Sequence, residues 1–480
     1  MNHSFRCYRT LFWFVLLVAV GMRLGHFFML HRDPVANIPV LDSASYDRAA
    51  RMIAFGEGLP KTVYFQAPFY PYFLAAIYLV SNGHPDAIRL VQMLLDILSV
   101  LMVISITRTL FNRPAALIAG FLAATYPVLI FQSGLLLKTT LNVLFACLML
   151  HLVLIRTPRV TAVRLTLLGC VTGWAAATQG SVLLQIPLLF LYVVLEAPWH
   201  RPSIWLKQWA WLVLGLVIAI GPFTWRNYHV SGRFVLLTAQ GGANFYLGNS
   251  PYSDGTSKRP PRVRMTPEHE EADFHREAER ALGRHLTPEE ASAYWTGEAL
   301  RWIRAHPWDA MKLQLRKLGL FWNKVEIPDN YDFDFYRRYS VWIRYPRYPF
   351  RIIGSLGIVG MMLGWRTWRK TWFLYAWIAS YCAIWVMFHI YSRYRLPVVA
   401  FLMPFVGLAG WSLLLWVREK RVGWLVGAGV VIGITAWGQS LPLTQYTHAQ
   451  PLFNLGSGLM QRGDAAGARD AWMEALSVTP

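Results

Sequence analysis

Long apolar segments alternate with short polar segments along most of the chain. The apolar segments run for about 15 to 22 residues, close to the length that a helix needs to cross the hydrocarbon of a bilayer. This pattern predicts an all-α polytopic membrane protein with about eleven transmembrane helices. The predicted spans are residues 10–30, 86–107, 115–133, 140–155, 165–178, 182–196, 208–225, 351–365, 372–390, 396–417 and 422–440.

One more apolar segment, residues 68–81, is short and contains Pro68 and Pro71. If it does not span and the N-terminus is cytoplasmic, every short basic loop lies inside, as the positive-inside rule requires. If it spans, all of these loops move outside. Residues 68–81 are therefore predicted to form an interfacial or re-entrant helix buried against protein. The basic loops contain Arg108, Arg113, Arg156, Arg159, Arg164, Arg201, Lys207, Arg366, Arg369, Lys370, Arg418, Lys420 and Arg421.

This topology divides the chain into four parts. They are an N-terminal transmembrane catalytic module (1–225) with a first exterior loop (31–85), a small and mostly helical exterior domain (226–350), the C-terminal transmembrane helices (351–440) and an exterior tail (441–480). Within the exterior domain, Phe234–Leu237 is β-like, and Thr287 is predicted to cap a helix with Glu290 at the capping-box position. We expect this domain to form a lid over the membrane part.

The charge balance is strongly basic, with a formal net charge of +20, yet 55% of the residues are hydrophobic. Most basic clusters lie between apolar segments, where topology and anionic membrane lipids explain them better than nucleic acid does. None of the four Cys lies in region 226–350, and the His residues there lack metal-ligand spacing. The sequence thus indicates no disulfide framework, no Cys-based metal site and no cofactor, and it leaves dependence on a divalent metal open.

Asp42 stands out in the first exterior loop, within Leu41-Asp-Ser-Ala-Ser-Tyr46-Asp47. A carboxylate at membrane level is costly unless it has a function. One interpretation makes Asp42 a general base toward an acceptor hydroxyl, and another makes it a helix N-cap. Asp47 is five positions away and would point to another side of a helix, so the two do not form a paired-carboxylate site.

Three cations, Lys138, Arg393 and Arg395, are predicted on the same outer face as Asp42. Such a group suits a phosphate or diphosphate held at the depth of the lipid headgroups. The alternative for each cation is snorkelling to the interface, which long cationic side chains at helix ends commonly do. Arg89 and Asp96 share one helix face and are predicted to neutralise each other.

The tail matches the pattern of one tetratricopeptide repeat. The matching positions are Leu455-Gly456, Gly463-Asp464, Ala468, Ala475-Leu476 and Pro480. A single repeat cannot bury its own apolar face. The tail is therefore expected either to bind a partner protein or to be a lone helical hairpin, the remnant of an array.

Taken in order, these motifs resemble the GT-C superfamily of polytopic glycosyltransferases. The nearest branch is that of protein O-mannosyltransferases and the lipid A aminoarabinose transferase, in bacterial versions with tetratricopeptide repeats. The motifs are Asp42-Ser-Ala-Ser-Tyr46, Pro68-Phe-Tyr-Pro71, Gly134-Leu-Leu-Leu-Lys138, Gly242-Ala-Asn-Phe-Tyr-Leu-Gly-Asn249, Arg316-Lys-Leu-Gly-Leu-Phe-Trp322 and Arg393-Tyr-Arg-Leu-Pro397, within roughly residues 1–420.

The resemblance implies a polyprenyl-phosphate sugar donor, transfer at the periplasmic face of a bacterial inner membrane, and a match between Asp42 and the family's loop aspartate. It also implies a set of candidate substrate-site residues: Tyr46, Asp47, Pro68, Tyr70, Asn244 and Asn249. The chain departs from the pattern at Ala67, where the aminoarabinose branch has Lys. It departs again at Lys138-Thr139-Thr140, where many relatives have an acidic residue.

Three functions remain for comparison. A lipid-phosphate-dependent glycosyltransferase needs a base for the acceptor and cations for the departing phosphate, and the chain offers both. A lipid or glycan transporter or flippase would place charged or broken helices near the bilayer midplane, within inverted repeats that are not evident here. A scaffold would explain the tail but not the first loop. The sequence does not identify the sugar, the acceptor, the stereochemical outcome or the oligomeric state.

Overall fold

The computed structural model describes residues 2–31, 39–56, 58–59, 61–154, 161–196, 201–345, 348–444 and 448–478. Within these ranges the chain forms helices and turns and no β-strand, in agreement with the predicted all-α class. Arg156 and Arg159 of the predicted inner loops, and Pro480 of the tail motif, lie outside the described residues.

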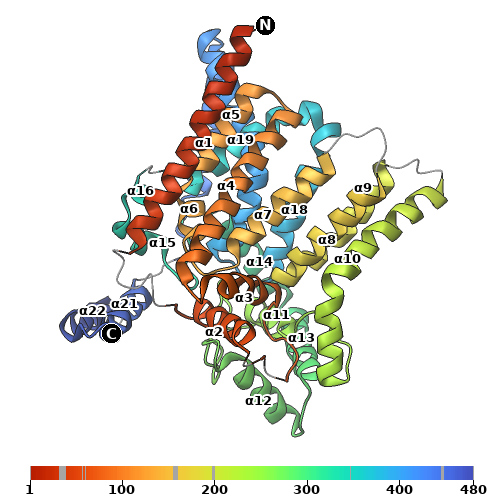
Figure 1. Cartoon of the computed structure of the whole chain (residues 1–480), viewed down its shortest axis with the longest axis vertical. Helices are drawn as coiled ribbons and strands as arrows, with labels where there is room; N and C mark the ends of the chain where they lie inside the picture. The colour runs from red at the N-terminus through yellow and green to blue at the C-terminus, as the bar shows by residue number, and fades with distance from the viewer. Residues whose placement is uncertain are drawn as a thin grey trace.

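Most of the apolar helices run side by side and make up the larger part of the molecule (Figure 1). Each predicted span overlaps one or two of them, although α1 begins eight residues before its predicted span and α10 extends six residues beyond its predicted span at each end. They are α1 (Asn2–Leu30), α4 (Pro85–Leu110), α5 (Arg113–Thr125), α6 (Pro127–Ser133), α7 (Thr139–Leu154), α8 (Ala162–Thr178), η1 (Gly180–Gln185), α9 (Ile186–Glu196), α10 (Pro202–Ser231), α17 (Phe350–Gly364), η3 (Trp365–Thr367), α18 (Trp368–Met387), α19 (Ser392–Arg418) and α20 (Val422–Gly438).

Among the described residues, four helices are long and apolar enough to cross a membrane, namely α1, α4, α10 and α19, and the bent pair α5–α6 adds a fifth. By the length and composition of these helices the chain is an integral membrane protein. Helices α7, α8 and α20 have 16 or 17 residues. At 1.5 Å per residue they reach roughly 24–26 Å, less than the ~30 Å of hydrocarbon. The figure of eleven spans therefore stays a prediction.

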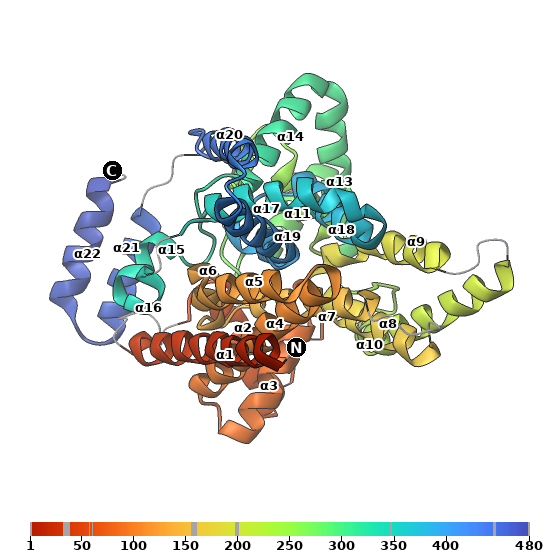
Figure 2. The same cartoon turned by 90° about the horizontal axis from the view of Figure 1, so that it is seen from above.

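Helix α19 occupies the centre of the bundle and packs against α5 and α17 (Figure 2). All residues from Arg395 to Gly407 are buried, as expected of a helix that is covered on every side. Two crossings require glycine, because a Cβ at Gly360 would overlap the Phe405 carbonyl and a Cβ at Gly407 would overlap the Ala115 carbonyl. This close packing fixes the middle of α19, whose first turn carries Arg393.

An ion pair lies where α5 meets α6, two helices that differ in direction by 53°. Asp96 accepts hydrogen bonds from Arg23 Nε at 2.9 Å and Nη2 at 2.7 Å, and Arg23 Nη1 also donates to the Ala124 carbonyl. Arg23 thus satisfies the backbone at the break. The predicted pairing of Arg89 with Asp96 is wrong, because Arg89 Nη1 instead contacts Asp86 at 2.6 Å. Seven residues place two side chains too far apart along a helix, whereas three bring them together.

The shorter helices gather at one end of the bundle (Figure 1). Helix α3, with 13 residues, is too short to span and packs against α2 and α4, as expected for a segment buried against protein. These helices are α2 (Asp42–Ala54), α3 (Phe69–Ser81), α11 (Gly241–Gly248), α12 (Glu270–Leu282), α13 (Pro288–Ala305), α14 (Pro307–Phe321), α15 (Phe333–Tyr336), η2 (Arg337–Tyr339) and α16 (Val341–Arg344).

Region 226–350 is built of two parts. Helices α11, α12 and α13 enclose a small core of their own that includes Phe274 and Trp295, and the predicted capping box of Thr287 and Glu290 is present. Residues from the end of α14 onward pack instead into the main core. The β-like interpretation of Phe234–Leu237 is wrong, because the Asn227 side chain, rather than a neighbouring strand, donates to the Val235 and Leu237 carbonyls.

The tail forms a helical hairpin of α21 (Ala449–Gln461) and α22 (Ala465–Val478). The two helices approach closely at Gly456, where a Cβ would overlap the Trp472 ring. The hairpin docks on the bundle through Leu452 and through an ion pair between His448 Nδ1 and Asp332 Oδ2 at 2.8 Å. The predicted hairpin is present, and its relation to tetratricopeptide repeats stays a prediction.

Candidate active site

Asp42 is the first residue of α2, and its carboxylate points into the protein. The N-cap position belongs to Leu41, and no side chain caps the helix, so the alternative interpretation of Asp42 as an N-cap is wrong. Instead Asp42 accepts hydrogen bonds from Arg393 Nη2 at 2.9 Å, Asn330 Nδ2 at 3.0 Å and Gln66 Nε2 at 3.3 Å. The side chain keeps 20% exposure, so the carboxylate remains accessible.

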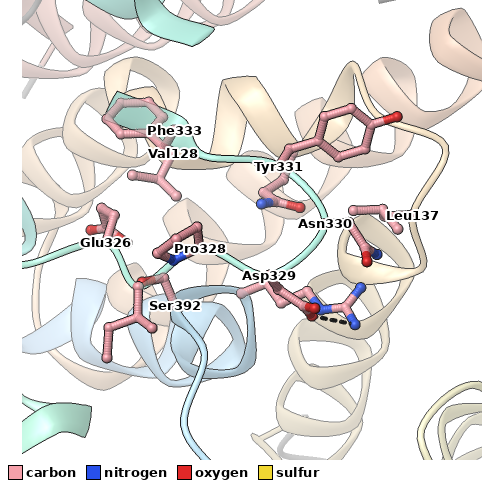
Figure 3. A pocket seen from close by; sticks show the side chains of 12 residues that line it. Val128, Leu137, Glu326, Pro328, Asp329, Asn330, Tyr331, Phe333 and Ser392 are labelled. Carbon is pink, nitrogen blue, oxygen red and sulfur yellow. Dashed lines mark ion pairs between the residues drawn. The ribbon is translucent and has the colours of Figure 1, made fainter. Parts of the chain in front are cut away.

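Arg393 joins Asp42 to a second carboxylate. The same Nη2 atom lies 2.5 Å from Asp329 Oδ2, without the alignment of a hydrogen bond. Figure 3 shows this ion pair as a dashed line, with Asn330 next to Asp329 on the same loop. The Nε and Nη1 atoms of Arg393 are buried and make no hydrogen bond of good geometry to the described residues. Arg393 therefore keeps two buried donors that no hydrogen bond satisfies within the described residues.

Lys138 lies in the turn between α6 and α7 and lines a cavity of about 340 Å³. A chain of hydrogen bonds fixes the start of this turn, because Tyr70 Oη donates to Gln92 at 2.8 Å and Gln92 donates to the Leu135 carbonyl at 2.6 Å. Among the described residues Lys138 makes no ion pair within 4 Å. The rest of the lining includes Ala67, Leu183, Leu184, Leu237, Asn244, Trp385, His389 and Tyr394.

The carboxylates in this cluster titrate differently. Burial alone would raise the pKa of Asp42, but the Arg393 charge and the hydrogen bonds from Asn330 and Arg393 outweigh burial and lower it. Burial raises the pKa of Asp329 to about 6, and burial together with the Asp42 charge raises that of Glu270 to about 7. Burial and the Arg393 charge lower the pKa of Lys138 to about 8. At neutral pH Asp42 is ionised and Lys138 is largely charged.

Arg395, the third predicted cation, makes contacts that differ from those of Arg393. Its guanidinium is buried against Glu326, with Nη2 2.6 Å from Oε1, and donates to the Asn323 carbonyl at 2.6 Å. Its charge also lies over the Phe350 ring. Through these contacts Arg395 fastens the loop after α14 to α19, and its role in phosphate binding stays a prediction.

The residues predicted from the first loop divide into two groups. Tyr46 and Pro68 line a second cavity of about 180 Å³, and Ala67 lines both cavities. Tyr70 is buried and packs edge-on against Tyr46, with ring centroids 5.1 Å apart. Asp47 faces away from Asp42 and binds Arg51 Nε at 2.9 Å and the Tyr78 hydroxyl, which ties α2 to α3.

The two asparagines of the α11 motif differ in role. Asn244 lines the larger cavity near Lys138. Asn249 is buried: its Nδ2 donates to the Met387 carbonyl at 2.6 Å, and its Oδ1 accepts from Lys317 Nζ at 3.2 Å. Asn249 thus holds the end of α18 in place, and it does not reach the cavity lining.

Three residues near Asp42, namely Asp329, Asn330 and Glu270, were not identified from the sequence. They lie in polar region 226–350, where acidic and amide residues are common and carry no positional signal. The only cue is the turn Pro328-Asp-Asn330 between two aromatic segments. Among the described residues, no group of three or more His, Cys, Asp or Glu side chains could hold a metal ion.

Residues 65–225 match the family model described as dolichyl-phosphate-mannose-protein mannosyltransferase. The matched range, roughly a third of the chain, includes Pro68 and Lys138 but not Asp42, Asp329 or Arg393. For this range the resemblance to GT-C glycosyltransferases is confirmed. No curated protein sequence matches the chain.

Several solved structures are similar to the chain. The apo oligosaccharyltransferase of Archaeoglobus fulgidus has a TM-score of 0.48 at 12% identity, covering 98% of this chain and 55% of that one. Apo ArnT from Cupriavidus metallidurans has 0.46 at 15% identity, covering 96% and 74%, and ArnT bound to undecaprenyl phosphate has 0.43 at 13% identity, covering 99% and 75%. The chain thus spans about half the length of the oligosaccharyltransferase.

Proposed function

We propose that the chain is a membrane glycosyltransferase that moves a sugar from a polyprenyl-phosphate donor to an acceptor hydroxyl at the periplasmic face of a bacterial inner membrane. Asp42 is the general base, and Lys138 and Arg393 hold the donor phosphate. One observation carries the proposal: an ionised Asp42, whose side chain is 20% exposed, is bound to Arg393 and lies near Lys138, which makes no ion pair within the described residues and lines a cavity. The family match supports a lipid-phosphate sugar donor.

The reaction has three parts: proton transfer to Asp42, cleavage of the bond to the phosphate, and stabilisation of the departing phosphate. The acceptor hydroxyl gives its proton to the Asp42 carboxylate as its oxygen bonds to the anomeric carbon. The bond between that carbon and the phosphate oxygen breaks, and the electron pair stays on the phosphate. Lys138 and Arg393 then stabilise the charge that develops on the departing phosphate, a task for which cations in a partly dry site are effective.

Donor binding also accounts for how Asp42 becomes a stronger base. In the free protein Arg393 neutralises Asp42 and lowers its pKa, which weakens proton uptake. A lipid phosphate that engages the unused Nε and Nη1 donors of Arg393 competes for the same charge. Because the Arg393 charge then acts on both the phosphate and Asp42, the pKa of Asp42 rises. Asp42 thus becomes a stronger base when the donor is bound.

The larger cavity has the composition that a phosphate with a hydrocarbon chain requires. Lys138 supplies the charge, while Leu183, Leu184, Leu237 and Trp385 supply apolar walls. Its lining comes from η1 and the end of α18 as well as from the outer segments. An isoprenoid chain can thus extend among the apolar helices while the sugar points toward Asp42.

We assign the end of the bundle that carries α2, α3 and α11–α13 to the exterior. The support is the sequence asymmetry, because the short basic loops fall at the opposite side when residues 68–81 do not span. Those loops are expected to contact anionic headgroups of the inner leaflet. Ser43 itself is buried, so single Cys residues introduced nearby at the exposed Arg48, and at Ser253 and Ser457, should label with an impermeant reagent from outside. Protection of Ser253 and Ser457 would reverse this assignment.

The tail is proposed to serve assembly rather than chemistry. Phe453, Met460, Met473 and Leu476 are each more than half exposed on the hairpin, although Leu452 is buried against the bundle. Exposed apolar side chains of this size suit a protein partner. Cross-linking at Met473 in membranes should capture that partner, and a variant with Met473→Lys and Leu476→Lys should lose it.

The direct test uses purified protein in liposomes with a radiolabelled polyprenyl-phosphate sugar and a panel of lipid, glycan and peptide acceptors. Label should move to an acceptor with release of polyprenyl phosphate. A flippase would instead change the accessibility of the donor across the bilayer and form no glycosidic bond. Such movement without transfer to any acceptor would replace the proposed function with transport.

A further inference from the structure

Two carboxylates share one nitrogen of Arg393, but they are held differently. Asp42 accepts well-formed hydrogen bonds from Gln66, Asn330 and Arg393. Asp329 lies 2.5 Å from the same Nη2 and accepts no hydrogen bond of good geometry at Oδ2 among the described residues. Hydrogen bonds to a carboxylate favour its charged form, so the two groups are suited to opposite protonation states.

We propose that Asp329 is a second catalytic residue, the acid that donates a proton to the departing lipid phosphate. The assignment rests on the proposed function, because it needs a phosphate at Arg393. It also rests on position: Asp329 and Arg393 line a pocket of only about 20 Å³ (Figure 3), but Asp329 also lies close enough to Lys138 of the larger cavity to feel its charge, and its side chain is 18% exposed. A phosphate held between Lys138 and Arg393 would lie within reach of this carboxyl group once the small pocket beside Arg393 opens.

The acceptor oxygen bonds to the anomeric carbon and loses its proton to Asp42. The bond from that carbon to the phosphate oxygen breaks with its electron pair on the oxygen, and Asp329 gives that phosphate a proton. The products are the glycoside, a lipid phosphate monoanion, protonated Asp42 and ionised Asp329. Since both carboxyl groups lie within 3 Å of one nitrogen, a proton can return from Asp42 to Asp329 for the next turnover.

The charges around Asp329 support a protonated state while the donor is bound. Arg393 and Lys138 attract its charged form, whereas Asp42 disfavours it, and Asp42 and Asp329 both disfavour the charged form of nearby Glu270. A lipid phosphate adds negative charge to this set. Burial already raises the pKa of Asp329 to about 6. This matches the second pKa of a phosphate monoester, ~6, so proton transfer between them is close to balanced.

The tyrosines that face the same cluster do not replace Asp329 as the acid. Tyr46, Tyr391 and Tyr394 surround the cluster, and the Arg393 guanidinium lies 5.2 Å from the centroid of the Tyr394 ring. Burial raises the pKa of Tyr46 and of Tyr391 well above that of an ordinary phenol, and the Asp42 charge raises that of Tyr46 further. Phenols with raised pKa values are poor donors at neutral pH. The carboxyl group of Asp329 is therefore the acid best matched to the leaving group.

The test compares Asp329→Asn and Asp329→Glu with the wild type in the liposome transfer assay between pH 5 and 9. The matched control is Asp334→Asn, which removes a carboxylate paired with Arg337 in the short helix after the same loop. Melting temperature in detergent reports folding for each variant. Wild-type kcat should fall as the pH rises above the pKa of the acid, because the general acid must carry a proton.

Asp329→Asn is expected to lower kcat by about 10- to 100-fold at pH 6 and to flatten this alkaline decline. Asp329→Glu should restore part of the rate and the decline, and Asp334→Asn should behave like the wild type. If the kcat of Asp329→Asn is within twofold of the wild-type kcat at every pH, the proposal is overturned. A loss of kcat with the alkaline decline unchanged also overturns it, because only a structural role then remains. If the wild type itself transfers no sugar, the proposed function has failed instead.

Discussion

Asp42 and Arg393 are 351 positions apart in the chain, yet Arg393 Nη2 donates to Asp42 Oδ2 at 2.9 Å. The contact joins the start of α2 to the start of the central helix α19. The candidate base and the candidate phosphate ligand therefore exist as a pair only in the complete fold. Each also limits the other, because the ion pair that orders the site also lowers the basicity of Asp42.

The first prediction concerns Arg393. Arg393→Gln leaves two partly buried carboxylates without their shared cation, and breaking such a pair typically costs about 3–5 kcal/mol. We expect a clear drop in melting temperature and loss of donor use. The double variant Arg393→Gln/Asp329→Asn should recover part of the stability, because it removes one unpaired charge. Additive losses in the double variant would show that the two residues do not interact energetically.

The second prediction concerns Lys138 and pH. Its pKa is lowered to about 8, so its charge is lost as the pH rises through that value. The KM for the donor should therefore rise above pH 8, while Lys138→Arg, which stays charged, should move this rise to higher pH. Lys138→Met should raise the KM about tenfold or more at pH 7. The exposed Lys324, changed to Met, is the matched control, and equal effects at both positions would remove Lys138 from the donor site.

The third prediction separates Arg395 from the site. Because Arg395 is paired with Glu326 and buried, Arg395→Gln should lower the melting temperature strongly. The apolar pair Arg395→Met/Glu326→Leu should be more stable than the single variant, and it should transfer sugar with a donor KM close to that of the wild type. A large increase in donor KM for a well-folded double variant would return Arg395 to the phosphate site.

The fourth prediction concerns the tail. Truncation after Leu441 removes the hairpin and the His448–Asp332 ion pair, but it keeps Asp42, Lys138 and Arg393. Transfer to a small acceptor should remain within a few-fold of wild type, with lower melting temperature because Leu452 no longer covers the bundle. His448→Ala separates the ion pair from the rest of the hairpin. A truncated protein that inserts normally and transfers no sugar would assign the tail to the catalytic unit.

The sequence predicted the helices well because apolar runs of membrane length have few alternatives to the helix. It identified Asp42, Lys138 and Arg393 because a charge beside an apolar run is conspicuous. It could have separated Arg393 from Arg395, since residues two positions apart differ by about 200° around a helix and face opposite ways. Asp329 and Asn330 do not lie beside an apolar segment, so the sequence did not single them out. They reach Asp42 only because a polar loop packs against α2 and α19.

The sequence also did not predict which residues pair with the buried charges. Asp96 was expected to pair with Arg89 on its own helix, but its partner is Arg23 on α1. Helical periodicity predicts which residues share one face of a helix. Which neighbouring helix lies against that face depends on packing. The same limit applies to the count of spans, since helices of 16 or 17 residues are set by neighbours as much as by the bilayer.

The central claim is that Asp42 takes the proton of the acceptor, and the most direct measurement is transfer by Asp42→Asn, which keeps size and polarity but is not a base. We predict normal insertion and a loss of sugar transfer on the order of a hundredfold or more. Asp47→Asn, which alters the neighbouring carboxylate bound to Arg51, should lose much less sugar-transfer activity. Near-normal transfer by well-inserted Asp42→Asn would contradict the account.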